Sequence, residues 1–414
     1  MGRTGRHHDG DHSVREDRGP VRYGPPAPWP GLPVLPELAD VLASAAGRAA
    51  PEPPGGSPAL REAAGTYWAR RGLRTGPGHV AAAPGTAPLL LALIAAHGGD
   101  VLLPRPCPAS WLPQARLLGR PAYQVPTPAE CGGVPDPYAL LETVRRVRAE
   151  GGRPRLLLLS PADDPTATVA PPELVREACE AAVDQGLHIV SDETWRDTLH
   201  RPHDTVLVGP AEMCPDDVTV LAGLHGALTP DAWPVAVARF PDTARAAVRH
   251  ARTLDVLTAL DATVAGPVAA AAAHALREPA AVTERARRSA ALHARLAAGA
   301  HRAVLCWGAL ARPPQAGRHL YADLAPLRGT LAARGVTDSL ELEEYLSARL
   351  GTPTPGGHRF GDELGALRVR LGTGALLGTD PVAQTAALTA ADPLELPPVA
   401  AALSIFRAAL DTPR

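Results

Sequence analysis

An α/β fold around a mainly parallel β-sheet is the fold class that the sequence predicts, on three observations. The 414 residues suffice for two domains. Hydrophobic residues make up 45% of the chain and charged residues 20%, so a large core can be buried. Short apolar runs alternate with helical segments at a regular pitch, which is typical of parallel strands that helices cover on both faces.

The elements follow in order along the first half of the chain. In the parallel sheet that they predict, ligands bind at the carboxyl ends of the strands. The turns at 84–87, 160–167, 192–195 and 222–227 are therefore expected to form one cleft. Strands are expected at 79–85, 100–106, 121–126, 153–161, 187–193 and 218–223, and helices at 57–72, 86–98, 111–119, 136–151 and 171–186.

The chain divides into three expected parts. Residues 1–30 are polar and then proline-rich, which predicts a disordered arm. Residues 31–285 are expected to form a large α/β domain, whose N-terminal segment contributes to the small domain. Residues 286–414 are expected to form that smaller C-terminal domain. Its α+β character rests on the apolar or alternating stretches 319–324 and 367–372 and a helix at 341–351.

Charge and cysteine usage exclude several function classes. The 41 basic and 43 acidic residues give a net charge of −2, which argues against nucleic acid as a partner. The apolar stretch 87–96 is too short to span a membrane. Cysteines without a metal-site spacing, and an N-terminus without an apolar signal region, favour a reducing cytoplasm. A solvated tail is favoured over a metal site for the cluster His7, His8, Asp11 and His12, so no metal is expected.

Lysine is absent from the chain, because all 41 basic residues are arginine, and asparagine is absent too. Codon bias in a GC-rich bacterial genome accounts for most of the missing lysines. It does not account for the loss of a lysine that a reaction requires. No Schiff base through a lysine amine and no Walker-type phosphate lysine can form.

Six stretches resemble, in the correct order, those of the class I/II aminotransferases, the fold-type I enzymes that use pyridoxal phosphate. The resemblance covers residues ~31–410. It implies the PLP-transferase fold type I, with a mainly parallel seven-stranded sheet, a small α+β C-terminal domain and a homodimer. The stretches are GSPALREAAGTYWARRG, PGTA, SPADDPTATV, VSDETWRDTLH, LAGLHGALTPDAWPVAVARFP and PGGHRFGDELGALRVRLGTG.

The resemblance implies roles for residues that match the family's cofactor site. Gly85 and Thr86 match the turn that holds the cofactor phosphate, where glycine permits close approach and a helix N-terminus binds anions. The alternative is an ordinary turn with Thr86 as a cap. Asp192 matches the carboxylate that keeps the pyridine nitrogen protonated. The alternative is an acid at a strand end.

Three further positions match the family's site with changes or with alternatives. Asp164 stands where the family has an asparagine that donates to the ring oxygen, and a carboxylate cannot donate. Trp195 replaces a tyrosine and could donate through its indole N–H or simply pack. Arg368 matches the arginine that grips the substrate carboxylate, against the alternative of a surface ion pair.

The decisive position is the family's Schiff-base lysine, which aligns with Gly226, or with His225 after a shift of one residue. Histidine can move a proton but forms no stable imine. The phosphate arginine aligns with Pro234, or with Trp233 in the other register. The aromatic that stacks on the ring maps near Pro106–Pro108, with Trp111 as the nearest candidate.

These losses leave three hypotheses. The first is a degenerate aminotransferase-like pseudoenzyme without ordinary transaminase activity, in which pyridoxal phosphate is implied by resemblance or has been lost. The second is a transferase or lyase that uses pyridoxal or pyridoxamine phosphate on an amino acid or amino sugar, with His225 as base. The third is a regulatory protein that binds a ligand or partner. A regulator fused to a winged helix is disfavoured because only ~30 residues precede the fold.

Overall fold

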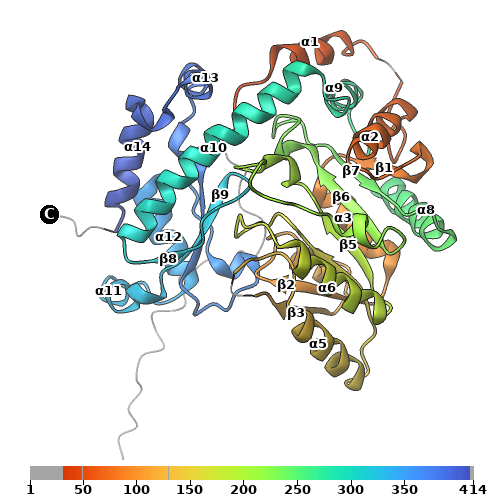
Figure 1. Cartoon of the computed structure of the whole chain (residues 1–414), viewed down its shortest axis with the longest axis horizontal. Coiled ribbons are helices and arrows are strands. Elements are labelled where there is room, and N and C mark those ends of the chain that lie inside the picture. The colour runs from red at the N-terminus through yellow and green to blue at the C-terminus, as the bar shows by residue number, and fades with distance from the viewer. Residues whose placement is uncertain (1–30, 49, 129, 411–414) are drawn as a thin grey trace, which may run out of the picture.

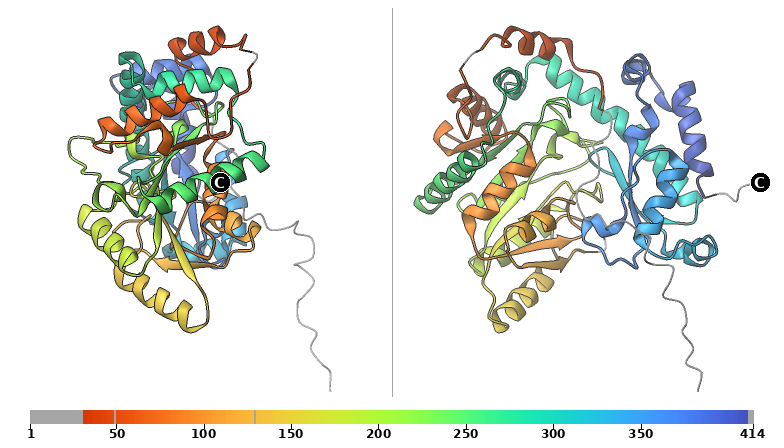
Figure 2. Two further views of the ribbon diagram at one scale, coloured as in Figure 1. Left: turned by 90° about the vertical axis from the view of Figure 1, so that its right-hand side faces the viewer. Right: turned by 180° about the vertical axis from the view of Figure 1, so that it is seen from behind.

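The computed structural model describes residues 31–48, 50–128 and 130–410, and it contains two domains joined by a long helix (Figure 1). The arm expected over residues 1–30 lies outside the described residues, and so does its histidine cluster. Figure 2 shows from the side and from behind that helices cover the central sheet of the larger domain.

A seven-stranded sheet forms the centre of the larger domain, in the order β1-β7-β6-β5-β4-β2-β3. Strands β2 to β6 pair in parallel with one another, and β7 pairs antiparallel with β1 and β6. The predicted mainly parallel seven-stranded sheet is therefore confirmed. Its strands are β1 (Val80–Ala83), β2 (Asp100–Arg105), β3 (Ala122–Pro126), β4 (Pro154–Leu159), β5 (His188–Asp192), β6 (Val218–Gly223) and β7 (Ala236–Arg239).

Burial on both faces explains why the strands read as continuous apolar runs. Along β4, Leu157 and Leu159 belong to one hydrophobic cluster, while Leu156 and Leu158 belong to another. Alternate side chains of a strand point to opposite faces, so both faces of the sheet are covered. The covering helices are α2 (Pro58–Arg70), α3 (Thr86–His97), α4 (Trp111–Leu117), α5 (Pro137–Ala149), α6 (Pro172–Asp184), α7 (Pro210–Met213), α8 (Ala244–Ala259) and α9 (Gly266–Leu276).

The smaller domain is built on an antiparallel sheet in the order β10-β9-β8. Its core includes Leu320 and Leu371 from the strands and Phe406 from the last helix. The strands are β8 (Leu310–Ala311), β9 (His319–Asp323) and β10 (Arg368–Gly372), and the helices are α11 (Arg328–Ala332), α12 (Ser339–Leu350), α13 (Pro381–Thr389) and α14 (Pro397–Ala408).

Helix α10 (Ala280–Cys306) connects the two domains and contains the expected domain boundary at 285–286. Val282, near its start, belongs to the core of the larger domain, whereas Leu292 and Leu296 belong to the core of the smaller one. In Figure 1 the helix runs diagonally from beside α9 to the smaller domain. One continuous helix therefore contributes to both cores.

Several elements were not expected from the sequence, among them α1 and β7 in the larger domain. Helix α1 (Pro36–Ser44) lies in a proline-rich segment, and its Pro36 stands at the first helical position, where a missing N–H is tolerated. Strand β7 is only four residues long, and its antiparallel direction breaks the strand–helix alternation. Strand β7 is too short to carry the periodicity on which the prediction depended.

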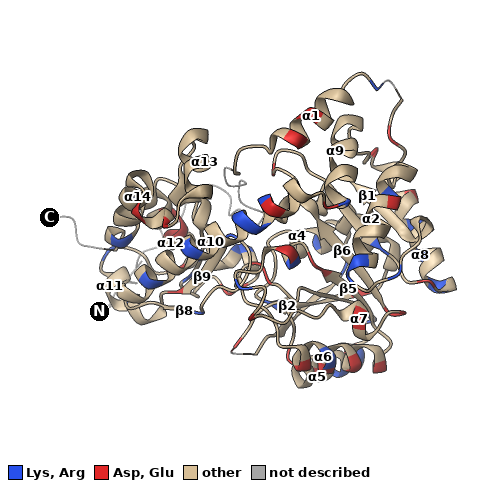
Figure 3. Cartoon of the chain, turned by 45° about the horizontal axis from the view of Figure 1, so that its top comes forward, with Lys and Arg blue, Asp and Glu red and all other residues tan. Residues whose placement is uncertain are grey.

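Surface charges of both signs are interspersed on α5 and α6 (Figure 3). Arg145 pairs with Glu142, and Arg176 pairs with Glu180. All five cysteines are free thiols. Within the described ranges, no helix is long and apolar enough to cross a bilayer, and no group of three or more His, Cys, Asp or Glu side chains could hold a metal.

Candidate active site

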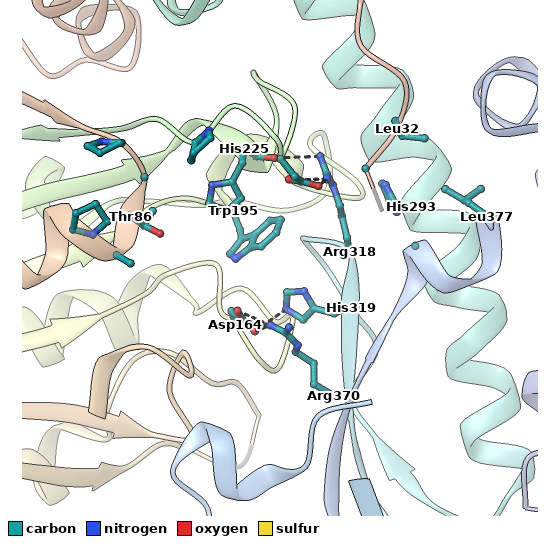
Figure 4. Close-up of a pocket in the computed structure, with 18 residues that line it drawn as sticks. Leu32, Thr86, Asp164, Trp195, His225, His293, Arg318, His319, Arg370 and Leu377 are labelled. Atoms are coloured by element: carbon teal, nitrogen blue, oxygen red, sulfur yellow. Dashed lines mark hydrogen bonds and ion pairs between the residues drawn. The ribbon is translucent and has the colours of Figure 1, made fainter. Parts of the chain in front are cut away.

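A cavity of about 390 Å³ lies between the two domains, at the carboxyl ends of the central strands (Figure 4). The larger domain contributes Asp164, Trp195 and His225 from the turns after β4, β5 and β6. The smaller domain contributes His319 and Arg370 from β9 and β10. The turns expected to converge thus do line one site, with a volume in the usual range for small ligands.

The start of α3 forms one wall of the cavity. Gly85 precedes this helix with a φ of 108°, which favours glycine, and Thr86 is its first residue. The unpaired N–H groups of the first turn and the Thr86 hydroxyl offer donors to an anion. Pro234 packs beside Gly85, since a Cβ at Gly85 would lie 3.4 Å from the Pro234 Cβ. The wall therefore has a helix N-terminus but no arginine at position 234.

Asp192 lines a smaller cavity of about 170 Å³ that shares Thr86 and His225 with the first. Its Oδ1 accepts hydrogen bonds from the Thr194 N–H at 3.0 Å and the Thr194 hydroxyl at 2.6 Å. Burial raises the pKa of Asp192 to about 6. A partner with a basic nitrogen would stabilise the carboxylate in this environment.

The turn after β6 holds the two residues expected at the lysine position. The His225 ring lines the cavity and makes an edge contact with Trp195, at 5.9 Å between centroids. Burial lowers the pKa of His225, so its ring is neutral near pH 7. Gly226 does not line the cavity, and a Cβ there would collide with the carbonyl oxygen of Thr194.

Arg318 fixes this turn from the smaller domain, a role that no sequence pattern indicated. Its guanidinium donates to the carbonyl oxygens of His225 at 3.3 Å and Gly226 at 3.0 Å. The same guanidinium pairs with Asp231 at 3.2 Å. The backbone at the lysine position is therefore held by an ion-paired arginine from across the cavity.

Arg370 lines the cavity, whereas Arg368, the residue predicted to bind the substrate carboxylate, lies outside the lining. Nη1 of Arg370 donates to both carboxylate oxygens of Asp164, at 2.7 and 2.8 Å. Arg368 instead pairs with Asp323 and Asp362, each at 3.0 Å, and lines a separate groove. The two arginines are two residues apart on β10 and so point to the same face of the strand, but only Arg370 lines the cavity.

Burial alone would raise the pKa of Asp164, but the Arg370 guanidinium holds it below the ordinary value. His319 lies 3.6 Å from the same carboxylate and makes an edge contact with Trp195. Burial lowers the pKa of His319 to about 4, so its imidazole is neutral. Trp195 is thus packed between two histidine rings, which favours the packing interpretation of this residue.

Comparisons with known proteins identify the family. The family described as "Aminotransferase class I and II" matches residues 34–350, which is well over half of the chain. The chain belongs to the class I and II aminotransferase family. A probable aspartate/prephenate aminotransferase of Thermus aquaticus is 30% identical over 203 residues, which cover 48% of this chain and 51% of that protein. The chain thus spans about half the length of the curated relatives it matches.

Solved structures show the same fold over most of the chain. Aspartate aminotransferase from Thermus thermophilus with maleate has a TM-score of 0.73 at 21% identity, over 87% of this chain and 88% of that one. N-succinyldiaminopimelate aminotransferase from Mycobacterium tuberculosis has a TM-score of 0.71 at 22% identity, over 88% and 91%. Both support the fold-type I architecture.

Family membership implies pyridoxal phosphate as the cofactor, and the residues of the cavity fit it only in part. Asp192 and the start of α3 at Thr86 suit a basic ring nitrogen and a phosphate. The covalent attachment does not fit, because the chain has no lysine and the Thr194 carbonyl fills the side-chain space at Gly226. The site therefore suits a ligand held without a covalent bond.

Proposed function

We propose that this chain is a degenerate class I/II aminotransferase that holds pyridoxal or pyridoxamine phosphate without a covalent bond and does not catalyse ordinary transamination. Position 226 carries this proposal. The family's reaction needs an amine there, this chain contains no lysine, and the Thr194 carbonyl occupies the space of a side chain. His225, the neighbouring alternative, forms no stable imine.

The residues of the α3 wall support non-covalent binding. Asp192 would pair with the ring nitrogen, and Thr86 with the first-turn N–H groups would hold the phosphate. When bound, the cofactor supplies an electron-withdrawing ring that stabilises negative charge on an attached carbon. The chain itself contributes binding, orientation and a buried environment at this wall.

A titration of the full-length protein with pyridoxal phosphate tests the proposal. We expect a saturable change in absorbance, and after borohydride reduction no cofactor fixed to any internal residue. Peptide mapping separates reaction at the N-terminal amine from reaction at an internal residue. Cofactor fixed at an internal residue would contradict the proposal, and so would binding of neither vitamer.

A matched pair of variants assigns the binding to the cavity. Asp192→Asn keeps the shape and removes the charge, so we expect pyridoxal phosphate affinity to fall about tenfold or more. Asp242→Asn makes the same change at a side chain that is 93% exposed and distant from the cavity lining, and it should leave affinity unchanged. Equal effects of the two variants would contradict the role of Asp192.

His225 favours a second candidate, a transferase or lyase that uses pyridoxamine phosphate on an amino acid or amino sugar. Its neutral ring lines both cavities and makes no hydrogen bond to the described residues, so a ring nitrogen can take up and return a proton. Proton exchange at the pyridoxamine methylene in deuterated water, followed by NMR, measures this directly. We expect His225→Gln to slow the exchange about a hundredfold.

A homodimer is part of the same proposal, by analogy with the family, and light scattering of the purified chain measures it. The third hypothesis, a regulatory protein that binds a partner, predicts a different result in the cofactor titration. A chain that binds neither vitamer but retains the fold would favour that role.

A further inference from the structure

The charges that line the cavity are already paired within the chain. Arg370 donates to both oxygens of Asp164, and Arg318 pairs with Asp231 while it also binds two backbone carbonyls. Both ion pairs join the smaller domain to the larger one (Figure 4). Each arginine that faces the cavity therefore has a carboxylate partner supplied by the opposite domain.

The three imidazoles of the cavity do not replace these cations. Burial lowers the pKa of His225, His293 and His319, so all three rings are neutral near pH 7. A carboxylate ligand needs a free guanidinium or another cation to replace its hydration. Among the described residues that line the cavity, each guanidinium already has a carboxylate counter-ion, so an entering carboxylate meets the negative charge of Asp164 or Asp231.

His293 on α10 presents an unused acceptor at the cavity wall. The Thr373 hydroxyl donates to the carbonyl oxygen of Arg318 at 2.9 Å, so its oxygen accepts from Nδ1 of His293 at 2.8 Å. This hydrogen bond places the ring proton on Nδ1 and leaves Nε2 as an acceptor. The residue is only 3% exposed, and its buried Nε2 has no hydrogen-bond partner among the described residues.

We propose that Asp164 is a built-in counter-carboxylate that reserves Arg370, so that the cavity selects ligands rich in hydroxyl and amino groups, such as amino sugars, over carboxylate ligands such as amino acids. Hydroxyl and ammonium groups supply the donors that the His293 and His225 nitrogens lack. This inference rests on the proposed function only in that the ligand enters the same cavity.

Competition between ligand charges tests the inference on the unmodified full-length protein. Succinate and succinamide have similar shapes but differ in charge, and glucosamine supplies hydroxyl and amino groups. We expect intrinsic tryptophan fluorescence and calorimetry to show the order glucosamine, succinamide, succinate in decreasing affinity. Succinate as the tightest of the three would overturn the proposal. No cofactor is added, so this result is independent of the pyridoxal phosphate titration.

Variants of the two adjacent aspartates identify the residue that sets this selectivity. Asp164→Asn removes the counter-charge and frees Arg370, so succinate affinity should rise about tenfold or more. Asp163→Asn is the matched control, because Asp163 has no hydrogen bond or ion pair with Arg370. Equal succinate affinity in the two variants would overturn the assignment of Asp164.

A second pair of variants tests the acceptor. His293→Phe should weaken glucosamine about tenfold. His97→Phe is the control, since Nε2 of His97 is also buried without a partner but the residue lies outside the cavity lining. Glucosamine affinity that is unchanged in His293→Phe would contradict the role of this ring.

Discussion

The two walls of the cavity have diverged to different extents from the family's pattern. The wall made by α3 and β5 keeps Gly85, Thr86 and Asp192, whose roles depend on backbone N–H groups and one carboxylate. On the opposite side, the turn after β4 and strand β10 supply the Asp164–Arg370 ion pair, and the turn after β6 has Gly226, outside the cavity lining, at the position that aligns with the family's lysine. The proposed function therefore assigns cofactor binding to the first wall and the loss of covalent chemistry to the second.

The strongest test of this comparison places a lysine, in separate variants, at each of the two residues that align with the family's lysine. Gly226→Lys should lower the free energy of unfolding by about 3 kcal/mol or more, because its Cβ collides with a backbone carbonyl. His225→Lys should fold, because its side chain points into the cavity. Chemical denaturation measures both variants.

The same pair tests whether chemistry can be restored. We expect borohydride to fix pyridoxal phosphate to His225→Lys but not to Gly226→Lys. Fixation at position 226 together with normal stability would show that the Thr194 carbonyl does not exclude a side chain there.

A smaller effect is expected from the buried acid next to the interdomain ion pair. Burial raises the pKa of Asp163 to about 7, and its Oδ1 has no hydrogen-bond partner. Because this folded pKa lies above the unfolded value of about 4, the folded protein loses stability as pH rises from about 4 to about 7. Asp163→Asn should therefore raise the free energy of unfolding at pH 7 by about 2 kcal/mol.

The opposite sign is expected for Asp164, whose pKa is held below its ordinary value. Its stabilisation is present above the unfolded pKa of about 4 and is lost as pH falls through the folded pKa. Denaturation of Asp164→Asn should show lower stability than the unmodified chain at pH 7 and a smaller difference at pH 3. The same sign for both variants would contradict the assigned environments.

The smallest effect is expected at Arg368, which lies outside the cavity. Arg368→Gln breaks ion pairs with Asp323 and Asp362, and the arginine is 39% exposed, so we expect a loss of about 1 kcal/mol or less. Pyridoxal phosphate and glucosamine affinities should not change. A change in either affinity would show that Arg368 contributes to ligand binding.

Local patterns in the sequence predicted most of the larger domain. The run of leucines predicted the buried strand β4, and Pro172 near the start of α6 indicated where that helix begins. Strand β7 escaped prediction because its four residues carry too little periodicity and pair antiparallel with distant partners. The turns at the carboxyl ends of the strands did predict where the cavity lies.

The chemistry of the interdomain wall depends on contacts between distant residues, which local patterns do not contain. Asp164 and Arg370 are 206 positions apart, and their ion pair exists because the fold brings β10 of the smaller domain to the turn that follows β4. The sequence comparison predicted Arg368, and only this long-range contact places Arg370 at the cavity. The exclusion of a side chain at Gly226 depends on the Thr194 carbonyl, which belongs to another strand end.

Helix α10 connects the cavity to the hydrophobic cores of both domains. Val282 in its first turn packs in the core of the larger domain, Leu292 and Leu296 pack in the core of the smaller domain, and His293, next to Leu292, lines the cavity. No proline interrupts α10, so a change in the angle between the domains requires this helix to bend or to shift against one of the two cores. A ligand that contacts His293 therefore touches the helix that both cores share. Its binding should change the rate of amide hydrogen exchange along the middle of α10.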